Sequence, residues 1–92
     1  MNTLRQRPLA VGPLRAFEAV ARHLNFRAAS EELFLTQSAV SRQIQGLEDE
    51  LGAPLFVRGT RHVELTTTGA SLLRAVAPML DRLDSTVEGD PE

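Results

Sequence analysis

Apolar residues recur with a helical period over residues 36–51, near the middle of the chain. Their spacing of four, three and four places them on one face of a helix, made of Val40, Ile44, Leu47 and Leu51. The opposite face has no acid before Glu48 and carries Gln37, Ser38, Ser41, Arg42 and Gln45. Short hydrogen-bonding side chains beside one guanidinium suit the edges of bases and the phosphates next to them. A helix face exposed only to water is the plain alternative.

A shorter helix is predicted upstream, over residues 13–24. Gly12 is its candidate N-cap and Pro13 a favourable first helical residue. The apolar stripe of this helix consists of Leu14, Phe17, Val20, Ala21 and Leu24. Three charged residues lie off the stripe at spacings that allow the pairs Arg15–Glu18 and Glu18–Arg22, and a solvated helix face is the plain interpretation.

A second short helix is predicted over residues 26–33, with Asn25 as its N-cap. Its core candidates are Phe26 and Leu33. Residues 34–36 then form a tight link, and Thr36 is a suitable N-cap for the helix that follows. Two short helices joined in this way, the second polar at its exposed start, form a helix-turn-helix.

A β-hairpin is predicted after the helix-turn-helix. Gly52 and Pro54 end the preceding helix. Extended segments over residues 55–58 and 62–65 then flank a turn at residues 59–61, so that three basic-type residues gather at its tip, Arg58, Arg61 and His62. A basic hairpin at this place is a wing, whose arginines can enter a minor groove or hold the nucleic-acid backbone. The alternative is an ordinary surface turn.

The last predicted helix covers residues 66–88, with Thr66 as its N-cap. It carries a heptad-like apolar seam made of Leu73, Val76, Leu80, Leu83 and Val87. So small a domain has little core of its own to cover this seam, so we expect a homodimer through this helix; packing back onto the first helix is the alternative. Pro78 predicts a kink near residues 75–78. Residues 1–8 are expected to be a flexible leader and residues 89–92 a frayed tail.

Composition bounds the chain to one small domain of 92 residues, 42% of them hydrophobic. Without cysteine, the chain can form neither a disulfide nor a zinc finger, which fits a cytoplasmic protein. No signal peptide or membrane-spanning stretch is apparent. The net charge of −2 is unevenly distributed: residues 1–62 carry eight arginines against six acids, and residues 63–92 carry two arginines against six acids.

Little in the sequence favours an enzyme. His23 and His62 are the only histidines, and the acids Glu48, Asp49 and Glu50 are consecutive, so they do not converge as a catalytic pair would. There is no glycine-rich phosphate loop and no metal-ligand spacing. We therefore expect no catalytic residue, no cofactor and no metal site.

The predicted fold is mainly α with a small β-hairpin: a winged helix-turn-helix over residues 9–65 followed by a long linker helix over residues 66–88. The string LRAFEAVARHLNFRAASEELFLTQSAVSRQIQGLEDELGAPLFVR, followed by VELTTTGASLL, resembles the N-terminal domain of LysR-type transcriptional regulators. The resemblance extends over about residues 9–87. Its opening, RAFEAVARHLNF, resembles the branch that contains regulators of glycine cleavage and of chromosomal β-lactamase.

The resemblance implies a bacterial transcription regulator that binds double-stranded DNA. The helix over residues 36–51 would enter the major groove, the wing would touch the backbone or the minor groove, and paired linker helices would place two domains on an interrupted palindrome. The implied DNA contacts are Thr36, Gln37, Ser38, Ser41, Arg42, Gln45, Arg58, Thr60, Arg61 and His62. Three positions depart from the family pattern: Arg27 replaces a frequent hydroxyl residue, Thr67 replaces a frequent proline, and Pro78 is unexpected.

The family also carries a large C-terminal domain that senses a small molecule. Because this chain ends after the linker helix, we expect a DNA-binding fragment in which a small-molecule effector could act only through that other domain. A winged helix used for protein–protein interaction, without specific DNA binding, is the competing interpretation, since a fold does not fix its function.

Overall fold

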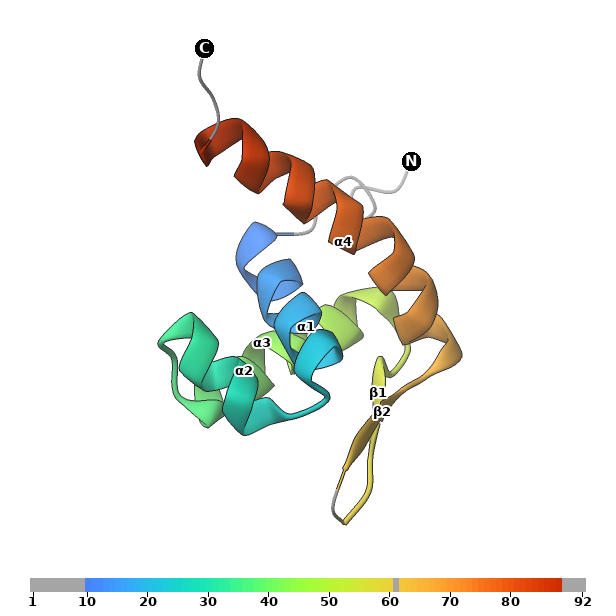
Figure 1. Ribbon diagram of the computed structural model, residues 1–92. Helices are drawn as coiled ribbons and strands as arrows, with labels where there is room; N and C mark the ends of the chain where they lie inside the picture. Colours follow the sequence, from blue (N-terminus) through green and yellow to red (C-terminus); the bar gives the residue numbers. More distant parts are fainter. Residues whose placement is uncertain (1–9, 61, 89–92) are drawn as a thin grey trace.

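The computed structural model describes residues 10–60 and 62–88. They form four helices and a two-stranded antiparallel sheet, in the order α1 (Val11–His23), α2 (Phe26–Leu33), α3 (Gln37–Leu51), β1 (Phe56–Arg58), β2 (Val63–Leu65) and α4 (Thr67–Glu88). Figure 1 shows the hairpin projecting beyond the helices and α4 crossing over α1. The predicted leader at residues 1–8, Arg61 and the tail at residues 89–92 lie outside the described residues. The mainly α fold with one small hairpin is confirmed.

Local capping sets the bounds of α2 and α3. The Asn25 side chain accepts a hydrogen bond from the backbone N–H of Ala28 at 2.7 Å. Thr36 Oγ1 accepts one from the N–H of Ala39 at 3.0 Å. Gly52 ends α3 in the left-handed conformation, at φ 72°, and its N–H donates to the carbonyl of Glu48. Each contact satisfies a backbone group that a helix end leaves without a partner, and each confirms the predicted cap.

The bounds of α1 differ from the prediction. The helix begins at Val11, its N-cap is Ala10 rather than Gly12, and it has no side-chain cap. Pro13 therefore lies third in the helix, where its missing N–H has no intrahelical acceptor to lose. At the other end, Leu24 is not a core residue. It is a left-handed C-cap at φ 52° and 44% exposed.

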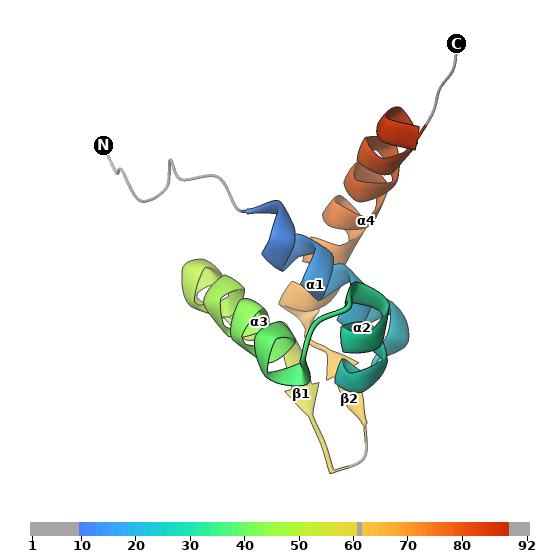
Figure 2. The ribbon, with the colours of Figure 1, turned by 90° about the vertical axis from the view of Figure 1, so that its left-hand side faces the viewer.

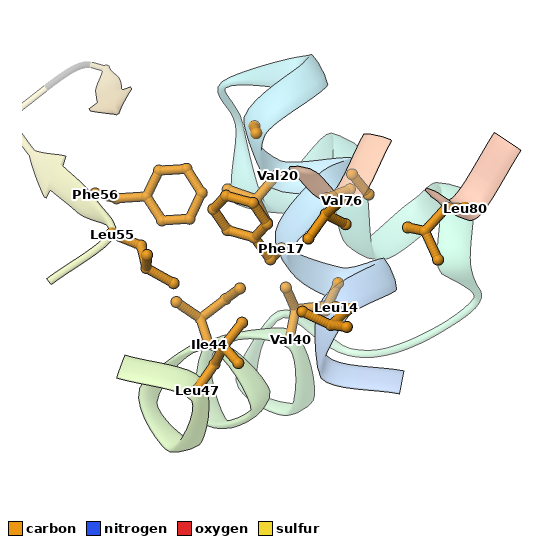
Figure 3. Close-up of a cluster of buried hydrophobic side chains, with 14 residues drawn as sticks. Leu14, Phe17, Val20, Val40, Ile44, Leu47, Leu55, Phe56, Val76 and Leu80 are labelled. Carbon is orange, nitrogen blue, oxygen red and sulfur yellow. The ribbon is translucent and has the colours of Figure 1, made fainter. Parts of the chain in front are cut away.

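The core surrounds α1 (Figure 3). Phe17 and Val20 of α1 are fully buried, as are Val40 and Ile44 of α3. The predicted α3 stripe is buried through Leu47, but Leu51 at the end of the helix is exposed. The start of the hairpin and α4 also contribute buried apolar side chains, namely Leu55, Phe56, Val76 and Leu80. Phe26 and Leu33 of α2 pack against this core while staying half-buried.

The hairpin pairs Phe56 with Leu65 and Arg58 with Val63. Because successive side chains of a strand point to opposite faces, Phe56 and Arg58 lie on the face toward the helices. Phe56 is buried there, whereas Val57, one residue along, is 57% exposed on the outer face. The hairpin is thus joined to the core by Phe56 of β1 and by Val63 and Leu65 of β2, which pack against it.

The start of α4 is fixed against the base of the wing. Thr66 Oγ1 accepts the N–H of Gly69 at 2.9 Å, which confirms the predicted N-cap. A side chain at Gly69 would collide with the carbonyl oxygen of Leu55. The absence of a Cβ therefore lets the first turn of α4 approach the backbone at the start of the wing.

The seam of α4 is divided between buried and exposed residues. Val76 and Leu80 are each only 4% exposed, because α4 packs on α1. Leu73 is half-buried, while Leu83 is 40% and Met79 is 44% exposed. The Val87 side chain lies outside the described part of the structure. The helix continues through Pro78 without a break, although that residue donates no backbone hydrogen bond to the preceding turn.

Candidate nucleic-acid interface

The polar face of α3 lies open to solvent along its first half. Thr36, Gln37, Ser38, Arg42 and Gln45 are exposed, and Ser41 is half-buried. No hydrogen bond or ion pair joins Arg42 to another residue of the described ranges 10–60 and 62–88. Its guanidinium is therefore available, with N–H donors in a planar fork that suits guanine and phosphate.

Two side chains of this face already have partners within the protein. The Thr36 oxygen accepts the N–H of Ala39, which leaves the hydroxyl hydrogen free to donate to an anion. Gln45 Nε2 donates to Asp49 Oδ1 at 3.2 Å, one helical turn further on. That exposed contact must be exchanged if Gln45 is to reach a base.

A groove joins the start of α3 to the wing. It is lined by Leu24, Asn25, Phe26, Arg27, Gln37, Arg58, Gly59, Thr60, His62 and Val63. Figure 2 shows the hairpin beside the starts of α2 and α3. Four of the predicted contacts, up to 25 positions apart in sequence, thus line one groove, and these are Gln37, Arg58, Thr60 and His62. Thr36, the N-cap of α3, directly precedes Gln37. The predicted contact Arg61 lies outside the described residues.

The basic residues around this groove differ in their partners. Arg58 lies over the Phe26 ring, with its Cζ 4.1 Å from the ring centroid. Arg27 is 3.4 Å from Glu31, in a pair whose side chains are 75% and 69% exposed. His62 Nε2 is 3.9 Å from Glu64, and both side chains are 71% exposed. Pairs as exposed as these contribute little and exchange readily.

The side of the protein formed by α1, α2 and α4 has a different electrostatic arrangement. Arg22 donates to Glu18 and to Glu32, each at 2.8 Å, and His23 Nε2 lies 2.7 Å from Glu32. These hydrogen bonds, first from Arg22 and then from His23, lower the pKa of Glu32 to about 2. The contact between Arg22 and Glu18 confirms the predicted Glu18–Arg22 pair. His23 lies in an ion-pair cluster.

Arg15 pairs with a residue far away in the sequence. Its two Nη atoms donate to the Asp84 carboxylate at 3.2 and 2.7 Å. The predicted Arg15–Glu18 pair is therefore wrong, because α4 brings a carboxylate that the local spacing does not reveal. Hydrogen bonding to Arg15 lowers the pKa of Asp84, and the same contact raises the pKa of Arg15. This bidentate pair joins α1 to the outer half of α4.

Glu48 has a structural role at the far end of α3. One of its carboxylate oxygens accepts the backbone N–H of Leu55 at 2.7 Å. The contact holds the segment between α3 and the hairpin, and it directs this acid toward the protein rather than toward the polar first half of the helix.

Two aromatic residues have roles that sequence reasoning missed. Phe34, in the turn of the helix-turn-helix, is 93% exposed and left-handed, at φ 58°. Phe26, predicted only as a core residue, also carries the Arg58 guanidinium. No periodicity signals either role, because one depends on a helix C-cap and the other on a contact between residues 32 positions apart.

The helix-turn-helix formed by α2 and α3 and the basic hairpin next to it together define a winged helix-turn-helix protein. A family model for bacterial regulatory helix-turn-helix proteins of the lysR family matches residues 12–70. The match covers more than half of the chain, which therefore belongs to the lysR family.

Relatives and solved structures agree with this assignment. The chain is 48% identical over 75 residues to the HTH-type transcriptional activator AmpR of Citrobacter freundii, covering 82% of this chain and 26% of that protein. It is 50% identical over 70 residues to the glycine cleavage system transcriptional activator of Escherichia coli K12, covering 76% and 23%. In structure it is similar to the BenM_DBD/catB site 1 DNA complex, with a TM-score of 0.79, 37% identity, and coverage of 85% of this chain and 88% of that one.

The chain spans about a quarter of the length of the curated relatives it matches. These two relatives are, by name, transcriptional activators. Within the described residues, no helix is long and apolar enough to cross a membrane. No group of three or more His, Cys, Asp or Glu side chains suited to a metal ion occurs in that part of the chain.

Proposed function

We propose that the chain binds double-stranded DNA sequence-specifically, as the DNA-binding domain of a cytoplasmic bacterial transcription regulator. The observation that carries the proposal is the exposed first half of α3, where Arg42 has no partner among the described residues and no acid precedes Glu48. The wing lies next to it across a shared groove. Support also comes from the BenM_DBD neighbour, which is a DNA complex.

In this proposal α3 enters the major groove. Gln37, Arg42 and Gln45 contact base edges, because their amide and guanidinium groups can form bidentate pairs with adenine and guanine. Hydroxyls and one wing arginine contact phosphates, namely Thr36, Ser38, Ser41 and Arg58. The positive end of the α3 dipole and the free N–H groups of its first turn favour a phosphate at the same place. Thr60, Arg61 and His62 contact the backbone or the minor groove at the wing tip.

The experiment is a selection of bound fragments from random-sequence duplex DNA by the purified 92-residue chain. We expect one motif to be enriched, and its affinity to fall steeply with salt because phosphates are neutralised on binding. Binding without enrichment would reject base recognition, and no binding at low salt would favour a protein-interaction module.

We propose further that two copies associate through α4 and present their α3 helices to an interrupted palindrome. Of the predicted interface, Val76 and Leu80 already pack on α1, so the apolar surface left to a partner comes from Leu73 and Leu83, joined by Met79. The outer part of α4 extends beyond α1 (Figure 2). Leu83→Glu should yield a monomer by sedimentation while the far-ultraviolet circular dichroism stays unchanged; an unaltered dimer mass would exclude this surface.

A further inference from the structure

We propose that Phe26, the first residue of α2, is a positioning residue for DNA binding: its ring holds the Arg58 guanidinium between the helix-turn-helix and the wing. The inference rests on the proposed function, since it assigns a cause to the orientation of one proposed phosphate contact. Phe26 itself is half-buried and touches the core, and it acts on the nucleic acid through Arg58.

The geometry of the contact is that of a cation–π pair. Arg58 Cζ lies 4.1 Å from the centroid of the Phe26 ring, within the limit of about 6 Å for such pairs. No carboxylate in the described residues forms an ion pair with Arg58. The ring therefore takes the place that Asp84 has for Arg15 and that Glu32 has for Arg22.

The ring is in turn held by the core. Phe26 packs edge-on against Phe56, with centroids 6.0 Å apart and an interplanar angle of 70°. Phe56 packs against the fully buried Phe17 at 5.5 Å. Strand alternation places Arg58 on the same face as Phe56, so the guanidinium comes last in a series of contacts that starts at the centre of the molecule.

An aromatic ring and a carboxylate, as alternative partners of an arginine, have different consequences for its binding of an anion. A carboxylate would occupy the N–H donors and cancel the charge, so a phosphate would have to displace it. A ring carries no full negative charge, so the charge of the guanidinium stays uncompensated, and a guanidinium that lies flat on the ring keeps the N–H groups at its edge free. Holding a long side chain in place also lowers the entropy that it loses on binding.

The surroundings of the stacked guanidinium fit a track for the DNA backbone. Asn25, Arg27, Gln37 and Thr60 line the same groove. This groove connects the start of α3, where bases would be read, with the tip of the wing. An arginine fixed at its wall holds positive charge beside the path of a phosphate backbone that enters from the major groove.

The test is a double-mutant cycle on DNA affinity with Phe26→Leu, Arg58→Ala and the double variant. The probe is the duplex enriched by the unaltered 92-residue chain or, without enrichment, one random-sequence duplex at low salt. We expect Phe26→Leu to weaken binding about two- to fivefold, as loss of an exposed cation–π contact implies, and to have no further effect once Arg58 is alanine. Phe26→Tyr keeps the ring and should keep the affinity.

A matched control separates positioning from folding. Leu33→Ala removes a half-buried side chain from the other end of α2. It should lower the thermal midpoint while its effect on affinity, measured well below that midpoint, stays the same with Arg58 present or absent. Should Phe26→Leu fail to fold, nuclear magnetic resonance of the unaltered chain tests the stack: the Arg58 side-chain protons should shift upfield, and their absence from the upfield region would overturn the proposal.

The outcomes distinguish the inference from the function on which it rests. The positioning role would be overturned if Arg58→Ala weakened binding and Phe26→Leu did not. It would also be overturned if Phe26→Leu caused the same loss of affinity with Arg58 present as with alanine at position 58. Either result would leave the DNA contact of Arg58 standing. Arg58→Ala without effect would overturn both the proposed contact and the positioning role. Absence of DNA binding by the unaltered chain would reject the proposed function itself.

Discussion

Two arginines on one side of this protein and two on the other have opposite surroundings. On the side formed by α1, α2 and α4, Arg15 and Arg22 are held by carboxylates at 2.7 and 2.8 Å. On the side formed by α3 and the wing, Arg42 and Arg58 have no carboxylate partner among the described residues, and Arg58 lies on an aromatic ring instead. Paired arginines join helices together, whereas unpaired ones remain available to an anion.

The difference explains why the net charge of −2 is a poor guide to the partner. Charges on the surface are screened over about 8–10 Å at physiological salt. A polyanion at α3 therefore responds to the nearby Arg42 and Arg58 much more than to acids on α4 such as Asp84, which is already neutralised by Arg15.

The largest expected effect tests the unpaired side directly. Arg42→Ala should weaken binding to the selected duplex by about 1–3 kcal/mol and relax the preference at one base position. The measurement is a titration at moderate salt against the selected duplex and against single-base variants of it. Arg82→Ala, which removes an exposed arginine of α4, is the matched control and should bind normally. Equal affinity of the Arg42 variant for all these duplexes would exclude its role in base recognition.

The next largest expected effect is on the free energy of unfolding, at the contact between the start of α4 and the base of the wing. Gly69→Ala puts a methyl group onto the Leu55 carbonyl, where backbone must move. Overpacking costs about 1–3 kcal/mol, and the better helix propensity of alanine returns at most about 1 kcal/mol. We expect a net loss of stability in urea unfolding. Gly46→Ala, in the same exchange on α3 with open space around the new methyl, should instead raise stability.

The paired side predicts a dependence on pH. Glu32 has a pKa of about 2 in the folded protein, below its usual 4.5, because Arg22 and His23 donate hydrogen bonds to it. Its contribution is present above pH 4.5 and is lost as the pH falls toward 2. Since the pair is exposed, Glu32→Gln should cost no more than about 1 kcal/mol at neutral pH.

Urea unfolding from neutral pH down to pH 2 checks this expectation: the gap between Glu32→Gln and the unaltered chain should close as the pH falls. Glu31→Gln, whose partner Arg27 is 3.4 Å away and exposed, serves as the control. A gap that persists unchanged in acid would mean that Glu32 acts through packing rather than through its charge.

The smallest expected effect concerns the turn between α2 and α3. Phe34 is left-handed and 93% exposed, so Phe34→Asn gives up almost no buried surface and places a residue that tolerates this conformation. A left-handed L-residue costs about 1–2 kcal/mol and asparagine relieves only part of this cost, so we expect a small gain in stability, seen as a higher thermal midpoint. Leu24→Asn, at a similar φ of 52° but only 44% exposed, should gain less. A lower midpoint for Phe34→Asn would show that its ring has a stabilising contact.

Much of the fold follows from local signals. Asn25, Thr36 and Thr66 each cap a helix through a contact three residues along the chain, and Gly52 ends α3 as a short-range backbone turn. The start of α1 has no such local signal, because Ala10 offers no side-chain cap and Pro13 fits at several positions of a first turn. The polar face of α3 was also predictable, since helical spacing alone decides which side chains share a face.

Sequence by itself thus determined the order and bounds of most elements and the set of polar side chains on α3, because those depend on neighbours within about one helical turn. Only the tertiary structure decided how those elements use their charges and apolar residues. Arg15 meets Asp84 across 69 positions, Val76 and Leu80 are buried in the core, and Arg58 lies over the Phe26 ring. These contacts depend on how α4 and the wing dock on α1 and α2, and packing of that kind has no period along the chain.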